Sequence, residues 1–98
     1  MILVTGTVLA RPDTLEAVLA ASLEHVRRSR EEPGCLLHSV HQDVEDPLRV
    51  SFLEHWRDSD ALATHFAVPA SLRFVETVTA LAAAPPSIEI YEAHRTSI

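Results

Sequence analysis

Four stretches of the chain have the β-branched or alternating apolar pattern that is typical of β-strands. They are residues 2–9, 35–43, 48–56 and 87–94. The turn Val-Glu-Asp-Pro at residues 44–47 is short, so we expect the second and third strands to form an antiparallel hairpin.

Helical spacing of apolar residues first appears after residue 12. Asp13 and Glu16 have the spacing of a capping box, which predicts a helix start there. Glu-Glu-Pro-Gly at 31–34 predicts its end. One mostly apolar face of this helix is expected to point inward: Leu15, Val18, Leu19, Ser22 and Val26.

A second helical region follows the third strand. Asp58 or Ser59 is expected to cap its start, and Pro85-Pro86 to end it. Pro69 cannot continue a helical hydrogen-bond ladder, so we expect a short helix followed by a longer one. The inner face of the longer helix is predicted to carry Leu72, Val75, Val78, Thr79 and Ala82.

The resulting order is βαββαβ, which predicts a ferredoxin-like α+β fold over residues 1–98 as a single domain. Two helical regions would cover one face of a four-stranded antiparallel sheet. With Glu45 and Asp46 at the hairpin tip, each sheet face receives a fixed set of hairpin side chains. The two predicted sets are Cys35, Leu37, Ser39, His41, Val50, Phe52, Glu54 and Trp56 on one face, and Leu36, His38, Val40, Gln42, Arg49, Ser51, Leu53 and His55 on the other.

Composition narrows the classes of partner. Hydrophobic residues make up 47% of only 98 residues, which indicates apolar surface that a second copy of the chain could cover. The net charge of -6 disfavours nucleic acid, and no apolar run is long enough to span a membrane. A lone cysteine, Cys35, excludes an internal disulfide and is typical of the cytoplasm.

Several short motifs, taken together, resemble the antibiotic biosynthesis monooxygenase (ABM) family. They follow one another over nearly the whole chain: Glu31 or Glu32 with Pro33-Gly34-Cys35, Asp46-Pro47, Glu54-His55-Trp56, Ala61-Leu62-Ala63-Thr64-His65, and Tyr91. The resemblance implies a homodimer whose two sheets form a shared α+β barrel, with a pocket between the sheet and the helices of each subunit.

The resemblance also implies a choice of activities. Family members include oxygenases that act on quinols and polycyclic phenols without metal or flavin, enzymes that degrade haem, and isomerases of small phosphorylated sugars. The haem-degrading relatives use an early Asn, and this chain contains no Asn.

His65 is the first candidate for chemistry, because an imidazole titrates near neutral pH and can act as a general base. The alternative is a structural hydrogen bond, for example to Glu54. Glu54 itself is interpreted as a structural polar residue that needs a partner if it is buried. Candidate substrate-binding residues are Trp56, Phe66, Tyr91, His41, Ser39 and Phe74.

A metal site is not predicted. His38 and His41 are three apart in a strand and point to opposite faces, and His25 and His94 are expected at the surface. With only two glycines there is no phosphate-binding loop, so no cofactor is expected.

The favoured interpretation is a cofactor-independent monooxygenase acting on a small hydroxylated aromatic or quinol. Two alternatives stay open: a non-catalytic dimeric small-molecule-binding module, and an isomerase of a small polar metabolite on the same fold.

Overall fold

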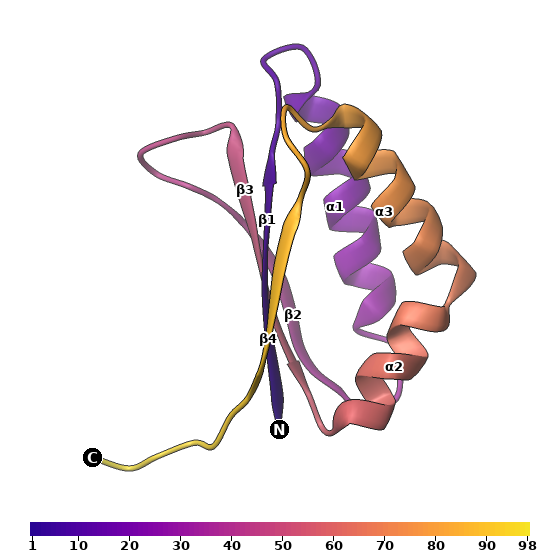
Figure 1. The fold of residues 1–98 in the computed structure, drawn as a ribbon, viewed down its shortest axis with the longest axis vertical. Coiled ribbons are helices and arrows are strands. Elements are labelled where there is room, and N and C mark those ends of the chain that lie inside the picture. Colours follow the sequence, from indigo (N-terminus) through magenta and orange to yellow (C-terminus); the bar gives the residue numbers. More distant parts are fainter.

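A computed structural model describes all residues 1–98 and shows the ferredoxin-like α+β fold (Figure 1). The elements in chain order are β1 (Ile2–Leu9), α1 (Leu15–Ser29), β2 (Cys35–Gln42), β3 (Arg49–Trp56), α2 (Ser59–Ala67), α3 (Pro69–Leu81) and β4 (Ser87–Glu92). The four strands pair antiparallel in the order β2-β3-β1-β4.

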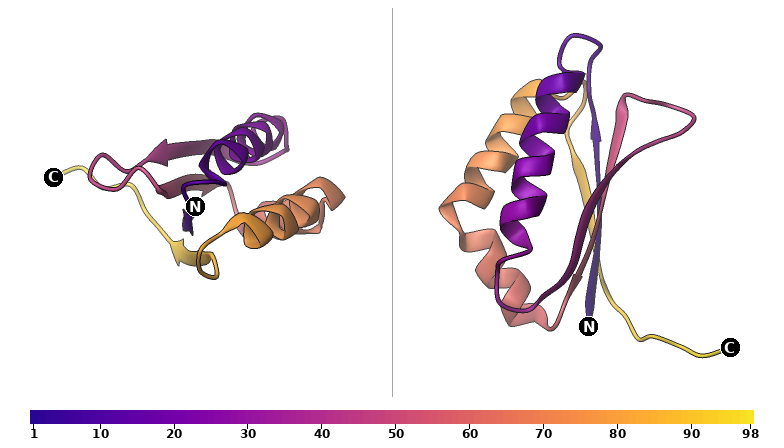
Figure 2. Two further views of the ribbon diagram at one scale, coloured as in Figure 1. Left: turned by 90° about the horizontal axis from the view of Figure 1, so that it is seen from above. Right: turned by 180° about the vertical axis from the view of Figure 1, so that it is seen from behind.

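The molecule has two layers, with all helices on one face of the sheet (Figure 2). The other face is not covered by any element of the same chain. Two apolar clusters fill the space between the layers. One is built around Val8, Val18, Val26, Val50 and Phe52, and the other around Ile2, Val4, Trp56, Ala61 and Leu62.

Helix α1 buries the face that its spacing predicts, but its start differs from the prediction. The cap residue is Thr14, whose side chain makes no capping bond to the helix. Its hydroxyl instead accepts from the Arg11 N–H at 2.9 Å and donates to the Leu81 carbonyl at 2.7 Å. Asp13 is exposed and pairs with Arg11, so the capping-box prediction is wrong.

The break at Pro69 and the Asp58 cap are confirmed. Asp58 accepts a hydrogen bond from the Ala61 N–H at 2.8 Å, and α3 begins at Pro69. Within α3, Val78 packs into the core, whereas Leu72 and Val75 stay more than half exposed beside a hollow under the helix.

The predicted division of the hairpin side chains between the two sheet faces is wrong for β2. A bulge between Cys35 and Leu37 adds one residue, which reverses the alternation beyond it. His38 therefore lies opposite Glu54 and Val40 opposite Phe52, on the helix side. Ser39 and His41 pair with Leu53 and Ser51 on the uncovered face.

Gly34 makes the tight connection from α1 to β2. Its φ of +82° lies in the left-handed region, and a Cβ there would come within 2.6 Å of the Ala61 Cβ. This close approach lets the connection between α1 and β2, which includes Glu32, pack against α2.

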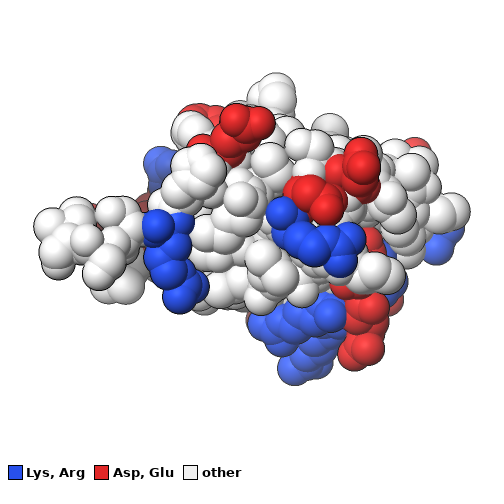
Figure 3. All heavy atoms as spheres, turned by 90° about the horizontal axis from the view of Figure 1, so that it is seen from below, with Lys and Arg blue, Asp and Glu red and all other residues white.

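No helix combines the length and the apolar character that crossing a membrane would require. On the face seen in Figure 3, arginine and acidic side chains are interspersed rather than gathered into a patch of one sign.

Candidate functional site

A cavity of about 610 Å³ lies between the sheet and the helices α2 and α3. Its exposed lining is predominantly apolar. The walls include Val8, Phe52, Phe66, Phe74, Val78 and Ile88, and the polar groups Glu54, His65 and His25 lie among them. A space of this size with a mainly apolar surface suits a small organic molecule.

His65 projects from α2 and is held by a carboxylate of the α1–β2 connection. Its Nδ1 lies 2.9 Å from Glu32 Oε1, and the Arg28 guanidinium donates to Glu32 Oε2 at 3.2 Å. An ionised carboxylate only accepts, so Nδ1 carries the ring proton and Nε2 keeps its lone pair. The partner of His65 is therefore Glu32, and not Glu54 as the structural alternative had suggested.

Trp56 lies against the His65 ring with a centroid distance of 4.6 Å and is fully buried. Its indole N–H donates to Glu54 Oε1 at 2.8 Å. Trp56 thus packs behind His65 and anchors Glu54, and it does not line the cavity.

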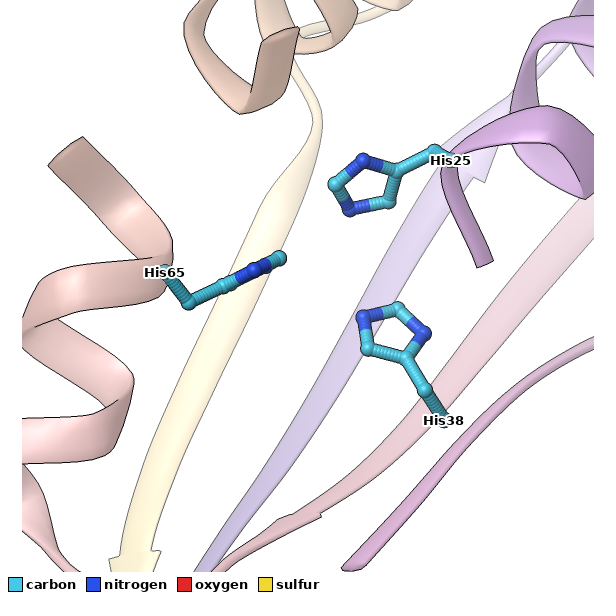
Figure 4. A group of neighbouring side chains, drawn as sticks. All are labelled: His25, His38 and His65. Atoms are coloured by element: carbon cyan, nitrogen blue, oxygen red, sulfur yellow. The ribbon is translucent and has the colours of Figure 1, made fainter. Parts of the chain in front are cut away.

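Two further buried histidines meet His65, one from α1 and one from β2 (Figure 4). The exposed fraction is 6% for His25, 2% for His38 and 2% for His65. His25 stacks on Phe74 at 4.0 Å, and its Nδ1 lies 2.7 Å from Arg28 Nη2. A guanidinium only donates, so the neutral His25 ring carries its proton on Nε2.

Burial determines the charge of two of these rings. It is the main cause that lowers the pKa of His25 to about 3, and repulsion from His38, His65 and Arg28 adds to it. Burial also lowers the pKa of His65, although hydrogen bonding and attraction to Glu32 oppose the shift. Both rings are therefore neutral at neutral pH.

Glu54 is the buried carboxylate of the site. Burial alone would raise its pKa, but His38, whose Nε2 lies 3.3 Å away, and the indole N–H of Trp56 outweigh burial and lower it. Glu54 therefore contributes a negative charge next to the histidines, as a structural polar residue with partners.

The structure brings together part of the sequence-predicted site. Phe66 and Phe74 line the cavity with His65. The other candidates, Ser39, His41 and Tyr91, lie on the uncovered face, because Tyr91 pairs with Leu3 while the neighbouring Ile90 pairs with buried Val4. The Tyr91 hydroxyl donates to Glu89, and the Ser39 hydroxyl lies 2.9 Å from His41 Nε2.

Three residues of the site were not singled out from the sequence. His25 was expected at the surface, which is wrong: it follows Val18 and Ser22 at helical spacing, and that spacing could have found it. His38 was placed on the opposite face from Glu54 because the bulge has no sequence signal. For Glu32, the motif left two neighbouring glutamates open, and Glu32 is the one that contacts His65.

Comparisons with known proteins agree with this architecture. The model of the family "antibiotic biosynthesis monooxygenase" matches residues 1–77. A Synechocystis sp. relative, uncharacterized protein sll1783, is 37% identical over 95 residues, which are 97% of this chain and 65% of that protein. This chain thus spans just under two thirds of that relative's length.

Solved structures share the whole fold. A crystal structure described as an antibiotic biosynthesis monooxygenase superposes with a TM-score of 0.89 at 28% identity, covering 97% of this chain and all, 100%, of the other. A Deinococcus radiodurans candidate for the same activity gives a TM-score of 0.94 at 26% identity, covering 100% and 97%. PA3566 from Pseudomonas aeruginosa gives 0.82 at 31% identity, covering 98% and 94%. The chain belongs to the antibiotic biosynthesis monooxygenase family.

Proposed function

We propose that the chain is a monooxygenase that oxidises a small hydroxylated aromatic or quinol without metal or flavin. One observation carries the proposal: a neutral, carboxylate-held imidazole, His65, stands in the wall of a largely apolar cavity of about 610 Å³. The relatives described as monooxygenases share this fold.

The proposed first step is proton removal. A phenol, quinol or anthrone seated against Phe66 and Phe74 gives a proton to Nε2 of His65. Glu32 holds the ring by Nδ1 and stabilises the imidazolium that forms, as a general base requires. The mainly apolar walls offer the substrate anion few polar contacts, so the anion stays electron-rich.

The electrons for the reaction come from the substrate. The anion passes an electron to O₂, and the radical pair combines to form a carbon–oxygen bond. The resulting peroxide takes the proton back from His65. Loss of water from this hydroperoxide breaks the O–O bond and leaves a new carbonyl or ring oxygen. One oxygen atom enters the product, the other leaves as water, and no external reductant is needed.

We also propose that the working form is a homodimer joined through the uncovered sheet face. This face carries apolar side chains among polar ones, with Leu3, Leu37, Leu53 and Tyr91 on the four different strands. A sheet face left open to water by its own chain would gain stability from burial against a second copy.

The experiment is oxygen uptake by chelator-treated, untagged protein with a panel of naphthoquinols and anthrones. We expect uptake above the spontaneous rate, and a decrease of about a hundredfold or more in His65→Ala. His94→Ala, at an exposed position beyond β4, is the matched control and should keep full activity. Absence of uptake across the panel would contradict the proposal and favour a binding module.

A further inference from the structure

The three buried histidines form a cluster that no step of the proposed oxidation requires. The ring centroids lie 5.3 Å apart for His25–His38 and for His25–His65, and 5.6 Å apart for His38–His65. One nitrogen from each ring can be chosen so that all three lie within 4.8 Å of one another. The rings come from α1, β2 and α2 and point toward one another (Figure 4).

His38 supplies an independent observation. Its side chain is fully buried, and neither ring nitrogen has a hydrogen-bond partner. Its Nε2 lies 3.3 Å from Glu54, a contact whose geometry falls short of a hydrogen bond. A buried, unpaired polar side chain is costly, and a ligand at this point would supply the missing partner.

We infer that His25, His38 and His65 bind one divalent transition-metal ion of the class of Zn²⁺ or Co²⁺. Three imidazoles are a donor set that such ions prefer, with a fourth position left for water or a ligand. His25 and His65 line the cavity, which gives the ion a path in and leaves that position open to it.

The surrounding charges also suit a cation. Glu32 is hydrogen-bonded to His65, and such a partner orients the imidazole and raises its basicity. Glu54 adds a second carboxylate 3.3 Å from Nε2 of His38. Metal–nitrogen distances of about 2.0–2.1 Å place tetrahedral ligand atoms about 3.3 Å apart, so side-chain rotation must draw the nitrogens inward by about an ångström.

The hydrogen bond between Arg28 and His25 disfavours coordination of the metal by His25. The Arg28 guanidinium donates to Nδ1 of His25, which holds the ring proton on Nε2. Coordination through Nε2 moves this proton to Nδ1, where a guanidinium cannot accept it. Replacing Arg28 with glutamine, whose amide oxygen accepts, is therefore expected to strengthen binding.

Metal binding does not depend on the proposed oxidation. The two processes require the same atom, Nε2 of His65, in different states. Coordination through Nε2 of His65 removes the lone pair that the general base needs. Metal-loaded protein is therefore expected to lose oxygen uptake, and removal of the metal to restore it.

The test uses untagged, chelator-treated protein titrated with Co²⁺, followed by visible absorption, and with Zn²⁺, followed by calorimetry. We expect one ion per chain. Single His25→Phe and His65→Ala variants should each weaken binding by more than the roughly tenfold expected for Glu32→Gln. His41→Ala and His55→Ala, on the other sheet face, are matched controls that should not change it.

Two results would overturn the inference: no saturable binding of either ion, or binding that the His25 and His65 substitutions leave unchanged. Arg28 also supports Glu32, so Glu32→Gln is the reference for this variant. Binding that is weaker in Arg28→Gln than in Glu32→Gln would overturn coordination through Nε2 of His25. Circular dichroism identifies any variant that fails to fold, and His25→Phe preserves the stack on Phe74. Oxygen uptake in the metal-free protein reports the proposed function separately.

Discussion

A hydrogen bond to a neighbour holds two of the three buried histidines, and this decides which nitrogen is available. Glu32 accepts a hydrogen bond from the Nδ1–H of His65, and the Arg28 guanidinium donates to Nδ1 of His25. His38 has only the nearby Glu54 carboxylate. His65 therefore keeps a free lone pair on Nε2, whereas the Arg28 guanidinium fixes the tautomer of His25.

Protonation of His25 is expected to make the free energy of unfolding depend on pH. The pKa of His25 is lowered to about 3, by burial first and then by His38, His65 and Arg28, with Glu54 opposing. Between about pH 6.5 and pH 3 the unfolded chain binds a proton at this residue that the folded chain does not bind. The free energy of unfolding should therefore fall as the pH drops through this window, by roughly 3–5 kcal/mol in total.

Urea unfolding of chelator-treated protein between pH 7.5 and pH 4.5 measures the part of this loss that falls above pH 4.5, about 2.7 kcal/mol. His25→Phe, which cannot titrate and keeps the stack on Phe74, should show a clearly flatter dependence. An identical slope in both proteins would show that another group causes the acid sensitivity.

At the scale of elements, the α1–β2 connection determines where the base stands. Gly34 adopts a φ of +82°, and a Cβ would meet the Ala61 Cβ at 2.6 Å. Gly34→Ala should therefore destabilise the fold by roughly 2–4 kcal/mol and displace Glu32 from His65. Urea unfolding measures the loss.

Adding Ala61→Gly to Gly34→Ala removes the clash but keeps the strained φ, so we expect partial recovery of stability. Full recovery would mean that backbone strain is negligible at Gly34. No recovery would mean that the contact with Ala61 does not matter.

The elements themselves could be predicted from the sequence because their signals are local. Residues 2–9 form β1 as expected, and Pro69 separates α2 from α3. The register of β2 could not be predicted, because the bulge after Cys35 has no signature in the apolar pattern of the sequence. The bulge nevertheless moves every later β2 side chain to the opposite face of the sheet. His65, Phe66 and Phe74 lie beside the cavity, whereas the bulge turns Ser39 and His41 to the uncovered face.

At the scale of the whole molecule, the helices cover one face of the sheet and leave the other uncovered (Figure 2). In the proposed dimer a second copy of the chain covers that face. Leu53 lies on the uncovered face of the central strand β3, so Leu53→Arg places an unpaired charge in the interface.

Sedimentation or light scattering should give the mass of two chains for the unmodified protein and of one chain for Leu53→Arg. Val44→Arg makes the same change at the exposed hairpin tip and should leave the mass unchanged. A single-chain mass for the unmodified protein at micromolar concentration would contradict the dimer.

In the proposed oxidation, His65 and the cavity direct one atom of O₂ into a substrate that supplies its own electrons. The most direct measurement is mass spectrometry of the product formed under ¹⁸O₂ by chelator-treated protein, with no added reductant. We expect one ¹⁸O atom per product molecule with the unmodified protein and little labelled product with His65→Ala. Product without label, or equal labelling in both proteins, would contradict it.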